Sequence, residues 1–309
     1  MSLGFNASDN ATGIIHEVGT FTDANLGGYV VSGTRYTTEL CLPNGDCKIG
    51  IIYSGENVSE DNWRYDQDGT YGIIGMGPNS FLWNGFADIE NNTVTYSMEL
   101  ARVNPLTSVH ETPVKIDGAI QSNISFGAAN DEVYQGDANV MINAQMDFTY
   151  ALDNFNFGIV YQNSDGDDES QYFFALDNNY PVEFTTNFKG LGLPADLYLQ
   201  VVALLEEMTN SEIVCDATTD GICVMPSMCS DYDSFTDYTF LFNFTDSTNG
   251  NYMRVPLATF ATNVKGSGGV TQCNVEITYL DSLSVQSSNI ILGGMFFQEF
   301  FGVFNNVHD

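Results

Sequence analysis

The chain has 309 residues, 43% of them hydrophobic and 13% aromatic, which is enough apolar material for one large β-rich unit or two lobes. Its 40 acidic and 8 basic side chains give a formal net charge of −32, which argues against nucleic acids and anionic membranes as partners. The excess indicates a solvated acidic exterior, and surface binding of divalent cations is the alternative that it leaves open.

Cysteines and glycosylation sequons both indicate an oxidising, extracellular compartment. The even number of cysteines and two short spacings between them are typical of disulfides. Zinc is not favoured, because no C-x-x-C pair occurs and the chain has only 3 histidines. The cysteines are Cys41, Cys47, Cys215, Cys223, Cys229 and Cys273. The N-x-[ST] sequons begin at Asn6, Asn10, Asn57, Asn91, Asn123 and Asn243.

The chain shows no targeting or membrane-spanning segment. Its first residues, MSLGFNASDN, are polar and lack the apolar core of a signal peptide. No apolar run approaches the ~18 residues that a membrane-spanning helix needs. We therefore expect the mature, processed form of a secreted or cell-surface protein that carries glycans and has no transmembrane segment.

Short strands separated by turns are expected along most of the chain. Gly, Asn, Asp and Ser recur about every ten residues between runs rich in Val, Ile, Tyr and Phe, the pattern of an antiparallel β protein. These runs cover residues 28–31, 48–53, 94–101, 157–162, 238–244 and 275–280. Residues 163–169 (NSDGDDE) are expected to form a turn between two strands. One helix is expected over residues 194–208, because proline and aspartate occupy its first turn and apolar residues recur at 197, 201, 204 and 205.

Four segments, in order, resemble the pepsin-like aspartic protease family. Residues 71–77 (YGIIGMG) are similar to the DGI-[LI]-G-[LM]-G segment of that family's N-terminal lobe, with Tyr71 at its aspartate. Residues 124–137 resemble the L-x-F-G … Y-x-G passage between the lobes. Residues 182–194 (VEFTTNFKGLGLP) are similar to the second catalytic loop, apolar-apolar-D-T-G-[ST]-S with its downstream proline and helix. Residues 290–304 (IILGGMFFQEFFGVF) are close to ILG-D-x-F-[LM]-x-x-[YF]-[YF]-x-V-F, the most specific of these matches.

The resemblance implies a mainly β, bilobal fold with a cleft between its lobes and one clear helix after the second loop. We predict an N-terminal lobe over residues 1–146 and a C-terminal lobe over residues 147–309. The earliest matching residues, 18–21 and 26–30, resemble the flap strand and the strand after it. The N-terminal lobe is therefore expected to lack its first strands.

The resemblance also implies a disulfide, since Cys229 and Cys273 match the long bridge of the family's C-terminal lobe. A bridge of that loop length stabilises by ~4 kcal/mol in the chain-entropy model. The two short spacings can each close a hairpin, through Cys41–Cys47 and Cys215–Cys223.

The catalytic aspartates of the family have no counterpart here. An aspartic protease needs two carboxylates that share one proton, one from each lobe. In the second loop the aspartate aligns with Thr185, and Thr186 and Asn187 follow where the family has Thr and Gly. A threonine hydroxyl cannot act as the general base of the pair. No D-[ST]-G occurs in the first 100 residues, and Val18 stands where a flap tyrosine is expected. The chain is therefore predicted not to be an enzyme.

Other chemistry is not favoured, and no cofactor or metal is predicted. Neither His16 nor His110 lies beside a G-x-S-x-G nucleophile context. Asp66 and Asp68 are interpreted as turn residues. One acidic cluster is a weak calcium candidate, but it lacks the spacing of an EF-hand loop and is better explained as a solvated hairpin tip. Its residues are Asp165, Asp167, Asp168 and Glu169.

Three functions follow from this interpretation. We favour a non-catalytic secreted or cell-surface glycoprotein that uses the degenerate fold as a structural or assembly module, polymerising by β-strand completion in trans, because missing first strands leave edges that recruit partners. The alternative is a pseudo-protease that binds a peptide or protein in an intact interlobe cleft. The remote alternative is an acid endopeptidase completed by an aspartate from another chain, which Thr185 argues against.

Overall fold

A computed structural model describes most of the regular secondary structure of the chain. The residues that it describes are 16–26, 29–41, 47–58, 93–100, 109–110, 123–126, 150–162, 168–174, 180–186, 188–210, 213, 215, 223–244, 253–265, 269–280 and 289–307. The chain divides into two compact units. Unit 1 comprises Met1–Tyr96, Thr112–Lys115 and Phe304–Asp309, and unit 2 comprises Ser97–Glu111 and Ile116–Val303. The lobe boundary expected between residues 146 and 147 lies outside the described residues and stays a prediction.

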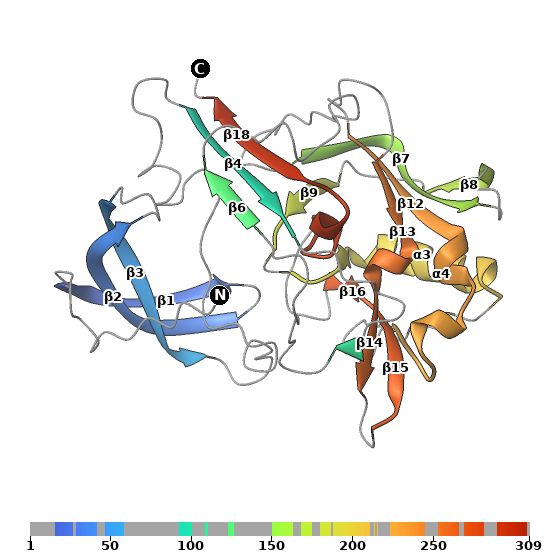
Figure 1. Ribbon diagram of the computed structural model, residues 1–309, viewed down its shortest axis with the longest axis horizontal. Coiled ribbons are helices and arrows are strands. Elements are labelled where there is room, and N and C mark those ends of the chain that lie inside the picture. Colours follow the sequence, from blue (N-terminus) through green and yellow to red (C-terminus); the bar gives the residue numbers. More distant parts are fainter. Residues whose placement is uncertain are drawn as a thin grey trace. The chain divides into compact units, whose positions relative to one another are not determined.

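Unit 1 contains a three-stranded antiparallel sheet, drawn in blue in Figure 1. Its strands are β1 (His16–Leu26), β2 (Tyr29–Cys41) and β3 (Cys47–Val58), and β2 lies between the other two. Successive side chains of a strand point to opposite faces of the sheet. Thr38 and Gly50 are buried on one face, whereas Ile49 and Ile51 are exposed on the other.

The largest sheet belongs to unit 2 and has eight strands, in the order β13-β12-β7-β9-β17-β10-β16, with β8 paired to β7. Its strands are β7 (Tyr150–Gln162), β8 (Asp168–Phe173), β9 (Pro181–Phe184), β10 (Leu191–Leu193), β12 (Tyr238–Phe244), β13 (Met253–Pro256), β16 (Ile277–Tyr279) and β17 (Ile290–Leu292). The strand predicted at 238–244 is confirmed as β12, and the one at 157–162 is the second half of β7. The run at 275–280 is divided between two strands, because Glu276 separates β15 from β16.

Two smaller sheets complete the described strands. One has the order β11-β15-β14-β5, from β11 (Cys223–Met225), β15 (Thr271–Val275), β14 (Ala261–Lys265) and β5 (Val109–His110). The other has the order β18-β4-β6, from β18 (Gly302–Val307), β4 (Thr93–Glu99) and β6 (Asn123–Phe126). The division between the two units falls within β4 and within β18.

The core of unit 2 is built largely from phenylalanine rings. Phe157 of β7 is fully buried, and its ring centroid lies 4.9 Å from that of Phe242 and 5.0 Å from that of Phe174. Phe296 lies in the 3₁₀ turn η6 (Phe296–Gln298), with its ring centroid 6.2 Å from that of Phe242 and 5.5 Å from that of Phe184. Buried aromatic pairs of this kind add to the hydrophobic stabilisation of the area that they bury. The turn after β17 is thereby anchored in the core of the large sheet.

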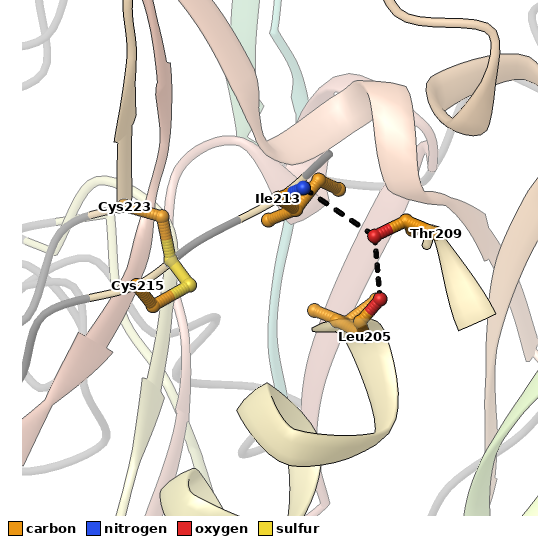
Figure 2. Close-up of a disulfide and its surroundings, with 5 residues drawn as sticks. All are labelled: Leu205, Thr209, Ile213, Cys215 and Cys223. Carbon is orange, nitrogen blue, oxygen red and sulfur yellow. Dashed lines mark hydrogen bonds between the residues drawn. A yellow bond between two sulfur atoms is a disulfide. The ribbon is translucent and has the colours of Figure 1, made fainter. Parts of the chain in front are cut away.

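The helix expected after Pro194 is confirmed as α3 (Ala195–Met208), with Pro194 at its N-cap. Leu197, Val201 and Leu205 are buried on one face, as their spacing predicts. Thr209 ends the helix: its hydroxyl donates a hydrogen bond to the carbonyl oxygen of Leu205 at 2.6 Å and accepts one from the backbone N–H of Ile213 at 3.3 Å (Figure 2). These bonds direct the chain toward Cys215.

Two disulfides of unit 2 join the cysteines that the sequence pairs, Cys215 with Cys223 (Figure 2) and Cys229 with Cys273. Cys229 lies in η3 (Cys229–Asp231), and its backbone N–H donates a 2.7 Å hydrogen bond to the side-chain oxygen of the buried Asn263. In unit 1, Cys47 is disulfide-bonded, and the residue opposite it in the β2–β3 pairing is Cys41. None of the helices among the described residues is long and apolar enough to cross a membrane.

Candidate functional site: the loop between β9 and β10

The segment that resembles a catalytic loop connects two strands that are not neighbours in the sheet. β9 and β10 flank β17, which pairs in parallel with β9 and antiparallel with β10. Residues 185–190, which join β9 to β10, therefore cross the end of β17, where Gly293 and Gly294 follow Leu292. The loop between β9 and β10 and the turn after β17 meet at this point.

Backbone hydrogen bonds fix the loop to that turn. The N–H of Thr185 donates to the carbonyl oxygen of Leu292 at 3.1 Å, which continues the β9–β17 pairing by one residue. In the opposite direction, three successive N–H groups of the turn donate to loop carbonyls at 2.7–2.8 Å, and the pairs are Gly293 to Gly190, Gly294 to Phe188 and Met295 to Lys189. Backbone groups of the loop and the turn that have no partner within a strand are paired in this way.

Glycine at 293 and 190 permits the close approach of these segments. A Cβ added to Gly293 would lie 2.4 Å from the carbonyl oxygen of Phe188 and 2.6 Å from that of Gly190. A Cβ added to Gly190 would lie 1.9 Å from the carbonyl oxygen of Glu276. Neither contact is available to a real side chain, so Gly293 is a steric requirement of the crossing and Gly190 is one of the packing of the loop against Glu276.

The described side chains of the loop carry no carboxylate. Thr185 is half-buried and Thr186 is exposed, and the side chain of Asn187 lies outside the described residues. A neutral hydroxyl at 185 can donate or accept a hydrogen bond, but it neither holds a negative charge nor accepts a proton at ordinary pH. The loop thus presents hydrogen-bonding groups and no general base at the position where the resemblance expects an aspartate.

The one cation of the loop forms an ion pair inside unit 2. The ammonium of Lys189 lies 2.7 Å from a carboxylate oxygen of Glu276, whose side chain is 5% exposed, whereas that of Lys189 is 52% exposed. A buried carboxylate is costly without a charged or hydrogen-bonding partner. Lys189 supplies that partner and connects the loop to the residue between β15 and β16. Neither local sequence indicates this pair.

Two further carboxylates of unit 2 also have structural partners. The hydroxyl of Tyr180 donates to the carboxylate of Asp196 in the first turn of α3, which ties the start of β9 to the helix. The hydroxyl of Thr259 donates to the carboxylate of Glu299 at 2.7 Å. Each carboxylate contributes a charge-assisted hydrogen bond that holds two elements together.

The remaining predicted site residues are only partly covered by the structure. Of the sequons, Asn123 is exposed at the start of β6, its amide donating a 3.3 Å hydrogen bond to the hydroxyl of Ser125, and Asn243 is half-buried in β12. Glycosylation stays a prediction at every sequon. Within the described part of the chain, no group of three or more His, Cys, Asp or Glu side chains could hold a metal ion. The following lie outside the described residues: Asn6, Asn10, Asn91, Asp66, Asp68, Asp165 and Asp167. Nothing is described of the side chains of His16, Asn57, His110, Asp168 and Glu169.

The fold is that of the pepsin-like aspartic proteinases. The crystal structure of the aspartic proteinase from Irpex lacteus matches 96% of this chain and 81% of its own chain, with a TM-score of 0.58 and 16% sequence identity. At that identity the likeness shows the fold alone. No family model matches the sequence, and no curated protein sequence matches it.

Proposed function

We propose that the chain is a non-catalytic protein of the cell exterior that uses its pepsin-like fold as an assembly module. The observation that carries the proposal is Thr185, which lies at the loop between β9 and β10 with its backbone bonded to Leu292. The scaffold of the loop is intact, whereas the carboxylate that the resemblance expects on it is replaced by a hydroxyl.

The chemistry of acid proteolysis explains why this replacement matters. Two carboxylates that share one proton hold the attacking water, and one of them accepts its proton. Thr185 offers no basic oxygen, and the carboxylate of Glu276, which contacts the loop through Lys189, is buried and paired with that lysine. Cleavage by this mechanism would need the carboxylates to come from elsewhere, so retention of the scaffold without its chemistry supports a structural use of the fold.

Disulfides and sequons support a location outside the cell. Disulfides persist in oxidising compartments, and two of them cross-link unit 2. Asn123 is exposed and begins a sequon, so an attached glycan would extend into solvent. A net charge of −32 keeps such a protein soluble among other extracellular components.

Assembly is supported by the edges of the unit 1 sheet. β1 and β3 are the outer strands of a three-stranded sheet, and no described strand pairs with the outer side of either. Unpaired strand edges recruit further strands by main-chain hydrogen bonding. Strands supplied by another copy or another protein would extend this sheet, and repetition of that contact would make a polymer.

The experiment has two arms on the same purified, glycosylated chain. The first measures particle mass by light scattering across a concentration series, with negative-stain microscopy of the same samples. The second incubates the chain with a mixed peptide library at acid pH, with and without pepstatin, and compares it with Thr185→Ala.

We expect large particles or filaments and no pepstatin-sensitive cleavage. A monomer at every concentration would refute assembly. Pepstatin-sensitive cleavage that Thr185→Ala abolishes would refute the non-catalytic interpretation. Pepstatin-sensitive cleavage that is equal in both chains and persists after a further purification step would refute it as well, because carboxylates from elsewhere in the chain would then do the chemistry. Cleavage that is lost at that purification step would come from a contaminating protease.

A further inference from the structure

Strand β3 of unit 1 exposes two isoleucines on one face. The exposed fractions of Ile49 and Ile51 are 73% and 47%, and Cys47, two residues earlier on the same face, is also exposed. Their neighbours across the β2–β3 pairing are polar, with exposed Glu39 opposite Ile49 and half-buried Thr37 opposite Ile51. At these two positions the apolar side chains of β3 therefore have polar neighbours on β2.

β3 is also regular along the part that carries these isoleucines. Residues 47–55 pair with residues 33–41 of β2 without a bulge, and the one irregularity of the pairing falls between Ser32 and Gly33. Proteins protect edge strands with bulges, prolines or charges. The described segment of β3 from Cys47 to Gly55 has no bulge and no proline, and its single charged residue is Lys48.

The charge of this segment sets it apart from the rest of the chain. The whole chain carries 40 acidic and 8 basic side chains, so most surfaces of two copies repel each other. Residues 47–55 (CKIGIIYSG) contain no acidic residue, and the one acidic residue of β3, Glu56, lies beyond them. β1, the other outer strand of the sheet, contains Glu17 and Asp23. Two copies can therefore approach through β3 with less like-charge repulsion than through β1.

We propose that two copies of the chain pair antiparallel through β3, about a two-fold axis at Gly50. This pairing places Ile49 of each copy opposite Ile51 of the other and Lys48 opposite Ile52. It joins the two three-stranded sheets into one and buries the exposed isoleucines of both copies against each other. The proposal rests on the assembly function proposed above and identifies its first contact.

The two-fold arrangement follows from the sequence of the strand. An isologous contact must be self-complementary, because the same residues face each other in reverse order. Centring on Gly50 places isoleucine opposite isoleucine at both positions of the open face. A shift of one residue would move the partner's isoleucines to the other face of the sheet. Only the register about Gly50 opposes Ile49 and Ile51 of one copy with Ile51 and Ile49 of the other.

The experiment changes the charge at the two isoleucines and measures dimerisation by sedimentation velocity on the full chain. In I49K/I51K, lysines face lysines at both positions, and we expect the dimer dissociation constant to rise by at least about a hundredfold, since like charges directly opposite each other destabilise a strand pair. In I49K/I51E, a cation faces a carboxylate at both positions, and we expect a dissociation constant at least about tenfold lower than that of I49K/I51K.

The controls are single lysine substitutions of apolar residues exposed on unit 2, Val224→Lys and Val270→Lys, whose exposed fractions are 48% and 60%. We expect neither to change the dissociation constant, and circular dichroism verifies that each variant is folded. If the wild-type chain assembles and I49K/I51K assembles equally, the β3 contact is wrong and the assembly function stands. If both double variants are equally weakened, the register about Gly50 is wrong. A wild-type chain that stays monomeric refutes the assembly function itself.

Discussion

Alanine substitutions of the two adjacent glycines after β17 are expected to have opposite effects on stability, because the surroundings of Gly293 and Gly294 differ. Gly293 donates its N–H to Gly190 at 2.8 Å, and an added Cβ would lie 2.4 Å from the carbonyl oxygen of Phe188. A Cβ on Gly294 would lie 3.7 Å from the same oxygen and 3.8 Å from that of Thr186, which are ordinary contacts. Neither glycine is among those with a positive φ in the described chain, so alanine fits the backbone conformation at both.

The effect of each alanine substitution on the free energy of unfolding can be estimated. The atoms that crowd Gly293 belong to the backbone of the loop, so relief requires the loop to move and the hydrogen bonds to Gly293 and its neighbours to lengthen. Overpacking of this kind costs up to about 3 kcal/mol, and we expect Gly293→Ala to reach that value. In a unit of this size the melting temperature should fall by about 6–12 °C. Gly294→Ala should be neutral or stabilise by up to about 1 kcal/mol, because it restricts the unfolded chain without a clash.

Differential scanning calorimetry of Gly293→Ala, Gly294→Ala and the wild-type chain measures the three melting temperatures directly. Urea denaturation of the same proteins provides free energies, with the denaturant dependence as a control for changes in the unfolded state. Melting temperatures of Gly293→Ala and Gly294→Ala that agree within about 2 °C would refute the proposed crossing of the loop over the end of β17.

Three further predictions concern stability and modification. Thr262 is 1% exposed, and its hydroxyl has no hydrogen-bond partner in the described structure, so Thr262→Val should raise the melting temperature by about 2–4 °C. Thr209→Val removes a hydroxyl that is bonded to Leu205 and Ile213, and it should therefore lower the melting temperature. Cys229 and Cys273 are separated by 44 residues, and Cys215 and Cys223 by 8. Replacing the first pair by alanine should therefore lower the free energy of unfolding by about 4 kcal/mol, and replacing the second pair by about 2.5 kcal/mol, as measured by denaturant titration. Equal losses of stability would contradict the loop-entropy argument. Asn123 is exposed on the outer strand β6, so Asn123→Gln should remove one glycan, which mass spectrometry of the secreted chain detects. A total glycan mass equal to that of the wild-type chain would show that this sequon is empty.

Local patterns were sufficient to predict the individual elements. Runs rich in Val, Ile, Tyr and Phe between turn residues located β12 and the second half of β7, and Pro194 with apolar residues at helical spacing located α3. These signals depend on neighbours a few residues apart, which is the range over which strand and helix periodicities act. The order of the strands depends on contacts between distant segments, and only the resemblance in four separated segments indicated it.

The details of the loop could not be predicted from spacing. Lys189 and Glu276 are 87 residues apart, and nothing in either local sequence indicates an ion pair. The need for glycine at 293 arises from Phe188 and Gly190, which approach only because β17 lies between β9 and β10. Similarly, the run K-I-G-I-I-Y of β3 is typical of a strand buried on both faces, and only the structure shows that Ile49 and Ile51 lie on an open face. Tertiary placement decides each of these features.

The prediction that Thr185 stands where the family has a catalytic aspartate can be tested by introducing that carboxylate. The N–H of Thr185 is bonded to Leu292, and the loop that follows is held by the turn at 293–295, so Thr185→Asp should leave the backbone of the loop unchanged. One carboxylate cannot form a pair that shares a proton, and we therefore expect Thr185→Asp to show no pepstatin-sensitive cleavage at acid pH and no pepstatin binding by calorimetry. Thr185→Asn, with the same shape and no charge, is the matched control for any change in folding. If Thr185→Asp cleaves peptides and Thr185→Asn does not, a second carboxylate is already in position, and the chain is one substitution away from an enzyme instead of a scaffold that has lost both catalytic groups.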